Sequence, residues 1–249
     1  MNNIISFSGG KDSTAMLLML LERHEPIHSI VFFDTGWEFP EILQHIDAVE
    51  MYTGIEIVRL KPAESFTYML QETPVIARKG PQKGQIHRYG YGWPSAMRRW
   101  CTRLKIEALS KYMRRQRDFV SCIGFAADEA KRVPVKHSKT WTERYPLIES
   151  NISGDEALKY CRDNGFSWGG LYDIFDRVSC FCCPLQRIGE LRNLRKHRPE
   201  LWNRMLSMQP SDDRGFRGWE TVADLDRRFA REDRQLDLFE TPMPNLGGK

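Results

Sequence analysis

Residues 8–13, near the start of the chain, have the composition of an anion-binding turn. Gly9 and Gly10 allow the backbone to turn tightly and to bring its N–H groups close to a ligand. Lys11 adds a positive charge, and Ser8 and Ser13 add hydroxyl groups. A helix that begins here also points its unpaired N–H groups and the positive end of its dipole at the turn. The segment therefore predicts a phosphate-binding site.

A glycine-rich turn is by itself a weak signal, because tight structural connections between a strand and a helix have a similar composition. The Walker sequence Gly-x4-Gly-Lys-Ser/Thr is absent, so an ordinary ATPase or GTPase of that type is not indicated. From the residues alone, a phosphate site and a structural turn both remain open; the family resemblance described below favours a nucleotide site.

Cysteines form the second group of residues with chemical potential. The chain has six of them, and Cys180 and Cys183 form a Cys-x-x-Cys unit with Cys182 between them. This usage favours a metal or redox role over a disulfide framework. Cys122, inside an expected strand, and Cys161, late in an expected helix, are expected to be core or surface residues.

Alternating strands and helices must position these groups. The expected strands are residues 4–7, 27–33, 55–60 and 118–125. The expected helices are residues 14–23, a second helix that follows the segment 37–41 and runs to about residue 53, a third to which residues 98–105 lead and which runs to about residue 115, and residues 153–164. This order predicts parallel β-α-β units in a doubly wound sheet. Ligands of such sheets bind beyond the carboxyl ends of the strands, where Ser8 and Asp34 lie. Ser153 and Glu156 form a capping-box pattern at the start of the last helix.

Two segments carry a resemblance to a known superfamily. Ser8-Gly9-Gly10-Lys11-Asp12-Ser13 resembles the pyrophosphate loop of the ATP pyrophosphatase (PP-loop) superfamily. Asp34-Thr35-Gly36-Trp37-Glu38-Phe39-Pro40-Glu41 resembles the second motif of its PAPS reductase branch. The resemblance implies an α/β fold with a doubly wound, mainly parallel sheet (HUP-like, Rossmannoid), here with a helical C-terminal segment. It also implies ATP and Mg²⁺ as cofactors, bound by residues 8–13, with Asp34 and Thr35 beside the adenosine and Asp12 near the metal.

Two further segments resemble the same branch with departures. Residues 98–105 resemble its Arg-Trp-Cys-Cys-x-x-x-Lys segment, except that Thr102 replaces the second cysteine. Residues 124–132 resemble its Gly-x-Arg-x-x-Glu-Ser loop, except that Ala126 stands where the family has an arginine, which counts against a sulfate-bearing nucleotide. The implied nucleotide-binding residues are Gly124, Glu129 and Arg132. The implied catalytic residues are Lys11, Asp12, Arg103 and Lys105. The candidate phosphate contacts are Arg103, Lys105 and Arg132.

The APS-reducing members of the family hold a 4Fe-4S cluster with a cysteine pair and a distant Cys-x-x-Cys unit. On this pattern the ligands here are Cys101, Cys180 and Cys183, and Thr102 removes the fourth. Three ligands leave one iron open to a sulfide or another external ligand; alternatively, the adjacent Cys182 completes the set. Zinc and simple buried thiols are the competing interpretations.

Composition limits the setting of this chemistry. No apolar run approaches the ~18 residues that a membrane span needs, and the chain enters a strand almost at once, so we expect a cytoplasmic protein without membrane association. The net charge is only +4, so a nucleic-acid surface must be local. Residues 74–95 lack periodicity and combine basic with aromatic residues, which predicts a long loop that either clamps a polyanion or is simply solvated. An arginine cluster at 187–204 either faces phosphates or is ion-paired.

The expected organisation is a PP-loop domain at residues 1–185, a helical arginine-rich extension at 186–234 and a flexible tail at 235–249. The tail sequence Gln235-Leu236-Asp237-Leu238-Phe239 matches the peptide with which many bacterial proteins dock on the DNA sliding clamp. The alternative is that these apolar residues cap the core.

The favoured function is that of an ATP-dependent sulfurtransferase that forms AMP and pyrophosphate and uses an iron–sulfur cluster. Nucleic acid is a candidate for the sulfur acceptor. A donor protein or sulfide would supply the sulfur. The first alternative is an APS or PAPS reductase, against which Thr102, Ala126 and the absence of a cysteine after Cys183 count. The second is a non-catalytic nucleotide-binding protein tethered to DNA machinery.

Overall fold

The computed structural model of the chain describes residues 2–134, 140–208, 210 and 215–240, with the backbone only for 236–240. It divides into two compact units. The first unit comprises Met1–Phe66 and Arg99–Cys183, and the second comprises Thr67–Arg98 and Pro184–Lys249.

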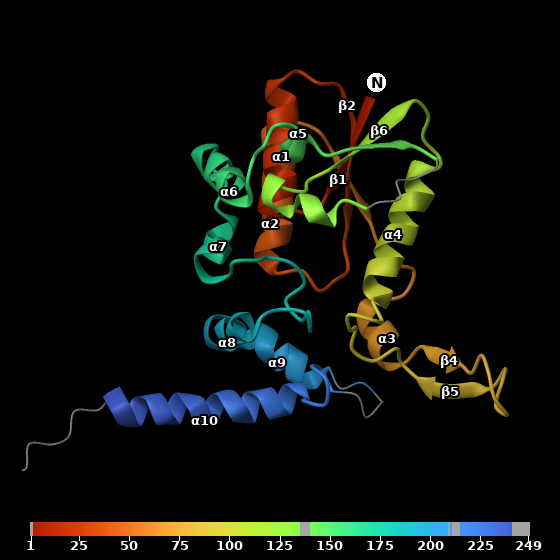
Figure 1. The fold of residues 1–249 in the computed structure, drawn as a ribbon, viewed down its shortest axis with the longest axis vertical. Helices are drawn as coiled ribbons and strands as arrows, with labels where there is room; N and C mark the ends of the chain where they lie inside the picture. Colours follow the sequence, from red (N-terminus) through yellow and green to blue (C-terminus); the bar gives the residue numbers. More distant parts are fainter. Residues whose placement is uncertain (1, 135–139, 209, 211–214, 241–249) are drawn as a thin grey trace, which may run out of the picture. The chain divides into compact units, whose positions relative to one another are not determined.

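A parallel sheet forms the centre of the first unit (Figure 1). Within the described residues it has five strands in the order β3-β2-β1-β6-β7, and all four pairings are parallel. The strands are β1 (Asn2–Phe7), β2 (Ile27–Phe33), β3 (Ile57–Leu60), β6 (Phe119–Ile123) and β7 (Thr142–Arg144). Because β1 lies between β2 and β6, its carboxyl end is the point at which the winding of the sheet reverses.

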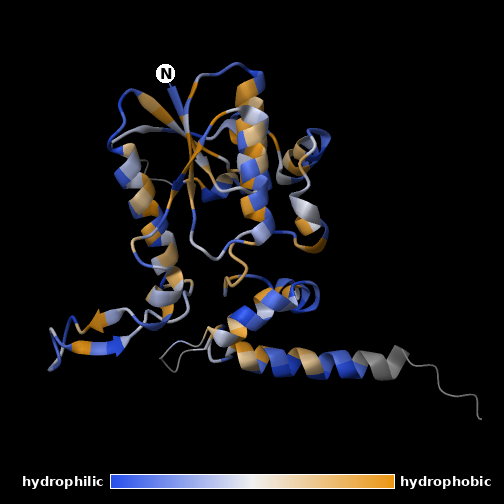
Figure 2. Ribbon diagram, turned by 180° about the vertical axis from the view of Figure 1, so that it is seen from behind, coloured by the Kyte–Doolittle hydropathy of each residue, from blue (hydrophilic) through white to orange (hydrophobic). Residues whose placement is uncertain are grey.

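Helices cover both faces of this sheet. They are α1 (Lys11–Glu22), α2 (Pro40–Thr53), α4 (Trp100–Met113), α5 (Pro146–Glu149), α6 (Gly154–Asp163) and α7 (Leu171–Ile174), with 3-10 turns at Ala127–Arg132 and Trp168–Gly170. Ile4 and Val31 pack against Met113 of α4 on one face. The next residues in the strands, Ile5 and Phe32, are also fully buried and point to the opposite face, on which α1 lies (Figures 1 and 2). The predicted doubly wound parallel fold is confirmed.

Local sequence explains where the helices begin and end. Pro40 occupies the first turn of α2, and Gly54 ends it in the left-handed conformation. At α6 the predicted capping box is present: the Ser153 side chain accepts the N–H of Glu156, and the Glu156 carboxylate accepts the N–H of Ser153. α1 is apolar almost all round because it packs between the sheet and α6.

The second unit contains α8 (Ile188–His197), α9 (Pro199–Ser207), α10 (Val222–Glu240) and an antiparallel hairpin of β4 (Pro74–Ile76) and β5 (Ile86–Tyr89); α3 (Phe66–Gln71) leads into the hairpin. The prediction of a long loop at 74–95 was wrong in this respect, because part of it pairs as strands.

Ion pairs account for part of the arginine cluster in the second unit. Arg192 pairs with Glu232, and Arg195 lies 2.8 Å from Asp226 and 2.6 Å from Asp233. The ion-paired interpretation therefore holds for these two arginines.

Residues 235–239 lie on the backbone of α10. Their side chains from 236 onward and residues 241–249 are outside the described part, so clamp docking and the proposed domain boundaries stay predictions. No helix among the described residues is long and apolar enough to cross a membrane.

Candidate functional site

Hydrogen bonds within the turn between β1 and α1 fix its shape. Ser13 Oγ lies 3.2 Å from Ser8 N and 3.0 Å from Ser8 Oγ, and it donates to the Gly10 carbonyl at 3.0 Å. Thr14 Oγ1 donates to the same carbonyl at 3.1 Å. The N-cap residue of α1 is Gly10, which has no side chain to cap the helix. The predicted residues 8–13 therefore come together as a preformed turn at a helix N-terminus, which suits an anion.

Glycine is required at position 9 by both conformation and space. Its φ is +74°, and a Cβ there would lie 2.9 Å from Ile42 Cγ2. The Gly9 carbonyl also accepts the indole N–H of Trp168 at 2.7 Å. α2 and the Trp168 turn thus hold the backbone of this turn in place.

Gly124 brings the end of β6 against the same turn. A Cβ at this position would lie 2.9 Å from Ser13 Cα and 3.0 Å from Ser13 N, closer than side chains normally approach backbone atoms. The structure therefore places Gly124 beside residues 8–13, as the family resemblance implied.

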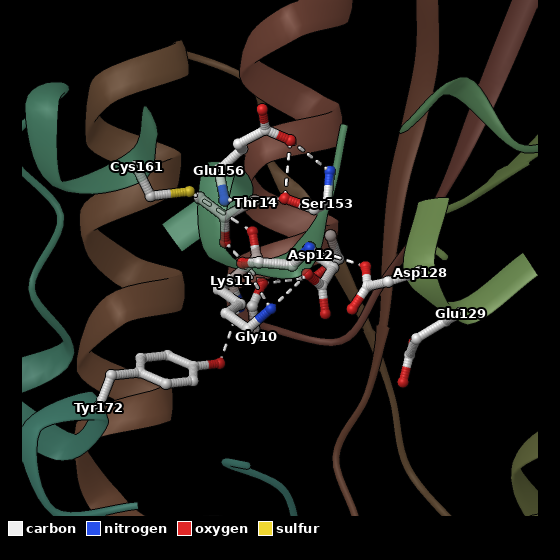
Figure 3. A network of polar contacts seen from close by, with 12 residues as sticks. Gly10, Lys11, Asp12, Thr14, Asp128, Glu129, Ser153, Glu156, Cys161 and Tyr172 are labelled. Carbon is white, nitrogen blue, oxygen red and sulfur yellow. Dashed lines mark hydrogen bonds and ion pairs between the residues drawn. The ribbon is translucent and has the colours of Figure 1, made fainter. Parts of the chain in front are cut away.

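Lys11 is directed by three contacts (Figure 3). Its Nζ lies 2.7 Å from Asp12 Oδ1 and donates to the Gly154 carbonyl at 2.7 Å, while its backbone N–H donates to the Tyr172 hydroxyl at 2.9 Å. Burial raises the pKa of Tyr172, so this phenol stays protonated. The Lys11 side chain is only 17% exposed. It is a partly desolvated cation whose position α6 and α7 help to fix.

Carboxylates surround this cation. Burial raises the pKa of Asp12; the hydrogen bond and charge of Lys11 oppose this shift, and the charges of Glu129 and Asp128 add to it. Asp128 and Glu129 lie beside Asp12 in Figure 3. Mg²⁺ usually binds through one or two carboxylates together with substrate phosphates. The oxygen donors suit that mode, although no grouping of described residues would hold a metal by itself.

The second predicted motif lies at the carboxyl end of β2. Asp34 Oδ1 accepts the N–H of Gly36 at 2.8 Å. Thr35 donates its hydroxyl and its N–H to the two carboxylate oxygens of Glu38 at 2.7 Å and 3.1 Å. This turn is therefore closed by Glu38, a residue that the sequence reading did not select.

The same turn pairs with the cysteine segment. Glu38 and Cys180 form an antiparallel bridge, and Phe181 N donates to the Trp37 carbonyl at 2.9 Å. Thr35 Oγ1 lies 3.8 Å from Cys180 Sγ. The structure thus brings the predicted adenosine motif and a predicted metal ligand into direct contact.

Of the three thiols implied as ligands, Cys183 acts electrostatically on both Cys101 and Cys180. Burial raises the pKa of Cys101, with the charge of Cys183 adding to the shift. Burial, followed by the charges of Glu38 and Cys183, raises the pKa of Cys180 to about 12, and Lys105 opposes this shift. Lys105 is thus a neighbour of the thiols, as its assignment to the site requires.

Thiol donors suit an iron–sulfur cluster or zinc. Among the described residues, however, no group of three or more metal-ligating side chains is close enough to bind an ion. Cys182 is buried at 1% exposure. The ligand set and the choice between three and four cysteines therefore stay predictions.

The remaining predicted residues have partners within the protein. Arg103 is 54% exposed and lies 3.6 Å from Glu107. Arg132 pairs with Glu129, and its guanidinium lies 4.7 Å from the centre of the Phe125 ring. A nucleotide that recruits either arginine would have to draw it away from these contacts.

Cys122 and Cys161 are buried, which confirms that they belong to the core. The Cys161 thiol also donates to the Lys11 carbonyl at 3.4 Å, a contact that the sequence reading did not anticipate. His45 was likewise missed: it is buried, and its Nε2 lies 2.8 Å from Thr14 Oγ1. Because that hydroxyl donates to the Gly10 carbonyl, we infer that His45 is the donor.

Comparison with known proteins gives relatives of similar sequence and fold. The chain is 30% identical over 210 residues to the uncharacterized protein MJ0066 of Methanocaldococcus jannaschii. The aligned region covers 81% of this chain and 40% of that protein. The chain thus spans well under half of that relative's length.

Solved structures include a phosphoadenylyl-sulfate (PAPS) reductase from Candida auris in a phosphate complex, with a TM-score of 0.51, 16% identity, and coverage of 72% of this chain and 81% of that one. The U34-tRNA thiolase NcsA from Methanococcus maripaludis, solved with its 4Fe-4S cluster, has a TM-score of 0.39, 16% identity, and coverage of 92% and 80%. The Candida auris structure shares the fold.

The family assignment rests on a match to a family model that covers most of the chain. Residues 2–186 match the phosphoadenosine phosphosulfate reductase domain, and this range takes in the turn at 8–13, the Asp34 motif and all six cysteines. The chain belongs to the phosphoadenosine phosphosulfate reductase domain family.

Proposed function

We propose that the chain is an ATP-dependent sulfurtransferase that splits ATP into AMP and pyrophosphate. The observation that carries this proposal is the contact between the Asp34–Glu38 turn and Cys180, formed by the bridge from Glu38 and the hydroxyl of Thr35. It supports a reaction in which the nucleotide and the thiols act at one place.

In the first step, an oxygen of the acceptor attacks the α-phosphorus of ATP. The bond between that phosphorus and the oxygen that bridges to the β-phosphorus breaks, and pyrophosphate leaves with the electron pair. The positive end of the α1 dipole and the Lys11 ammonium stabilise the charge on pyrophosphate; electrostatic stabilisation of this kind is usually the largest contribution to catalysis. Lys11 would exchange its contact with Asp12 for the phosphates.

Asp12 would then be free to bind Mg²⁺. Its raised pKa reflects burial near Asp128 and Glu129, and a divalent cation would relieve the repulsion among these carboxylates. The metal would neutralise the phosphates of ATP. Exchange of Lys11 between Asp12 and a phosphate couples nucleotide binding to metal binding.

In the second step, a sulfur nucleophile attacks the carbon that bears the adenylated oxygen. The carbon–oxygen bond breaks and AMP leaves with its electron pair. Cys101, Cys180 and Cys183 would hold a 4Fe-4S cluster, which, when bound, supplies an iron with an open position for external sulfide. The charge of Lys105 opposes the rise in the pKa of Cys180 without cancelling it, so formation of a thiolate at Cys180 would depend on the bound metal.

The test separates the two halves of the proposal. Lys11→Ala should abolish pyrophosphate release from ATP and leave iron content after anaerobic purification unchanged. Cys101→Ser, Cys180→Ser and Cys183→Ser should each lower iron and sulfide content and sulfur transfer while ATP still binds. Pyrophosphate release by Lys11→Ala at the wild-type rate would refute the assignment of the turn.

The family match also favours a second candidate, reduction of APS or PAPS. Sulfite release from either nucleotide, dependent on a thiol reductant, would identify it. Ala126, 1% exposed where the family has an arginine, favours ATP over a sulfate-bearing nucleotide. Binding of ATP without any turnover would instead indicate a non-catalytic protein.

A further inference from the structure

The β4–β5 hairpin of the second unit carries a concentration of positive charge that the proposed ATP chemistry does not use. Residues 73–98 contain no Asp or Glu and five Lys and Arg residues, more positive charge than the net +4 of the entire chain. They are Arg78, Lys79, Lys83, Arg88 and Arg98. This segment is thus a local excess of positive charge in a chain whose charges are otherwise nearly balanced.

The tip of the hairpin presents much of this charge to solvent. Arg78, Lys79 and Lys83 are exposed, and none of them has an ion-pair partner among the described residues. Figure 2 shows the turn as hydrophilic between strands that carry hydrophobic residues. A pocket of about 580 Å³ lies here, lined by Ala77, Arg78, Lys79, Pro81, Gln82 and His87. Unpaired cations around a hollow suit an anionic partner.

The hairpin has a defined shape. Ala77 N donates to the Gln85 carbonyl at 3.0 Å, and Gly84 N donates to the Ala77 carbonyl at 2.9 Å. At the base of the hairpin, Gly90 N donates to the Thr73 carbonyl at 2.8 Å. Position 90 favours glycine because its φ is positive and because the Leu70 carbonyl leaves no space for a Cβ. The cations therefore project from a hydrogen-bonded ribbon.

An apolar surface lies beside the charge. Pro74 pairs with Tyr89 and Ile76 pairs with Ile86, with an irregularity in the register between Val75 and Ile76. Ile76, Ile86 and Tyr89 are 47%, 50% and 53% exposed. Exposed apolar side chains with an aromatic ring, next to unpaired cations, have the two components that bind unpaired nucleotides: a surface for bases and charge for phosphates.

We propose that the β4–β5 hairpin binds single-stranded nucleic acid, with phosphates at Arg78, Lys79 and Lys83 and a base against Tyr89. This site goes beyond the proposed function, because it requires neither ATP nor the cysteines. If both proposals hold, it indicates that the sulfur acceptor is a nucleotide in an unpaired segment.

The test uses the full chain, a fluorescently labelled 20-nucleotide single strand of DNA or RNA, and the matching duplex, with anisotropy measured at 50–300 mM salt. Arg78→Glu/Lys79→Glu/Lys83→Glu should weaken single-strand binding at least tenfold. The dependence of log K on log salt concentration should lessen by about 2, because each single-strand phosphate contact contributes about 0.7. Tyr89→Ala should weaken binding about fivefold or more, and Tyr89→Phe should restore it.

The matched control is Lys111→Glu/Arg114→Glu/Arg117→Glu, which makes the same change of charge at exposed residues of α4 and the segment after it. This control should bind within about twofold of wild type after allowance for net charge. Equal losses in both triple variants, tighter binding of the duplex, or no binding by the wild type at 50 mM salt would overturn the proposal. Pyrophosphate release from ATP is measured separately, so failure of one proposal is distinguishable from failure of the other.

Discussion

Gly124→Ala tests whether the end of β6 holds the phosphate turn in position. Its φ lies outside the left-handed region, so alanine is compatible with the backbone and only space opposes it. The new methyl would lie 2.9 Å from Ser13 Cα, 3.0 Å from Ser13 N and 3.1 Å from Asp12 C. Ordinary contacts begin at 3.4 Å, so the start of α1 or the end of β6 must move by about 0.5 Å.

The expected cost follows from that displacement. Overpacking of this kind lowers the free energy of unfolding by about 1–3 kcal/mol. Each kcal/mol lost should lower the melting temperature by about 2–4 °C. Since a misplacement of about 1 Å in a catalytic site can cost about 100-fold in rate, we expect about a tenfold loss of pyrophosphate release. Thermal unfolding would measure the loss of stability, and a pyrophosphate assay with a calorimetric titration with ATP would measure the effect on the turn.

Gly189→Ala is the matched control. A Cβ at Gly189 in α8 would have no atom within 4 Å, so the same substitution should stabilise the protein by up to about 1 kcal/mol through helix propensity. It should leave ATP affinity unchanged. If Gly124→Ala binds ATP and melts like the wild type, the inferred contact between β6 and the turn is wrong.

Three further changes test individual contacts. Burial is the largest cause of the raised pKa of Cys180, and the charge of Glu38 is the second. Glu38→Gln removes that charge, so the Cys180 thiol should react several-fold faster with iodoacetamide at pH 8. An unchanged rate would show that the charge of Glu38 does not act on this thiol. Burial lowers the pKa of His45 to about 4. As the pH drops, the imidazole is protonated in the unfolded chain before it is protonated in the folded protein. The free energy of unfolding should therefore fall by up to about 3 kcal/mol between about pH 6.5 and about pH 4. His45→Gln should remove that part of the pH dependence in urea unfolding, and a parallel dependence in both proteins would contradict it. Ser153→Ala removes half of the α6 capping box and should lower the free energy of unfolding by about 1 kcal/mol, whereas an unchanged urea midpoint would exclude a stabilising cap.

Much of the first unit follows from local sequence signals. The buried run 27–33 has the predicted bounds, because its apolar residues are continuous, and the second helix ends at residue 53 as predicted. Its start at Pro40 was not predicted. The turn at 8–13 was likewise predictable, since glycines and the helix start act locally. β7 escaped prediction because Thr142–Arg144 is a three-residue segment of polar residues that pairs only at the edge of the sheet.

Long-range contacts account for what the sequence did not predict. The bridge between Glu38 and Cys180 joins segments far apart in the chain, and neither residue type signals the other. The same holds for Tyr172, which reaches Lys11 only because α7 folds back toward the turn. The β4–β5 hairpin was missed because its apolar residues remain exposed, so they lack the pattern of a half-buried strand.

The central claim is that ATP is cleaved between its α- and β-phosphates at the turn of residues 8–13. The most direct measurement is product analysis with ATP labelled in the α-phosphate, incubated anaerobically with Mg²⁺, sulfide and total cellular nucleic acid. We expect labelled AMP and an equal amount of pyrophosphate, with both absent in Lys11→Ala. Labelled ADP, or turnover that survives in Lys11→Ala, would contradict the claim.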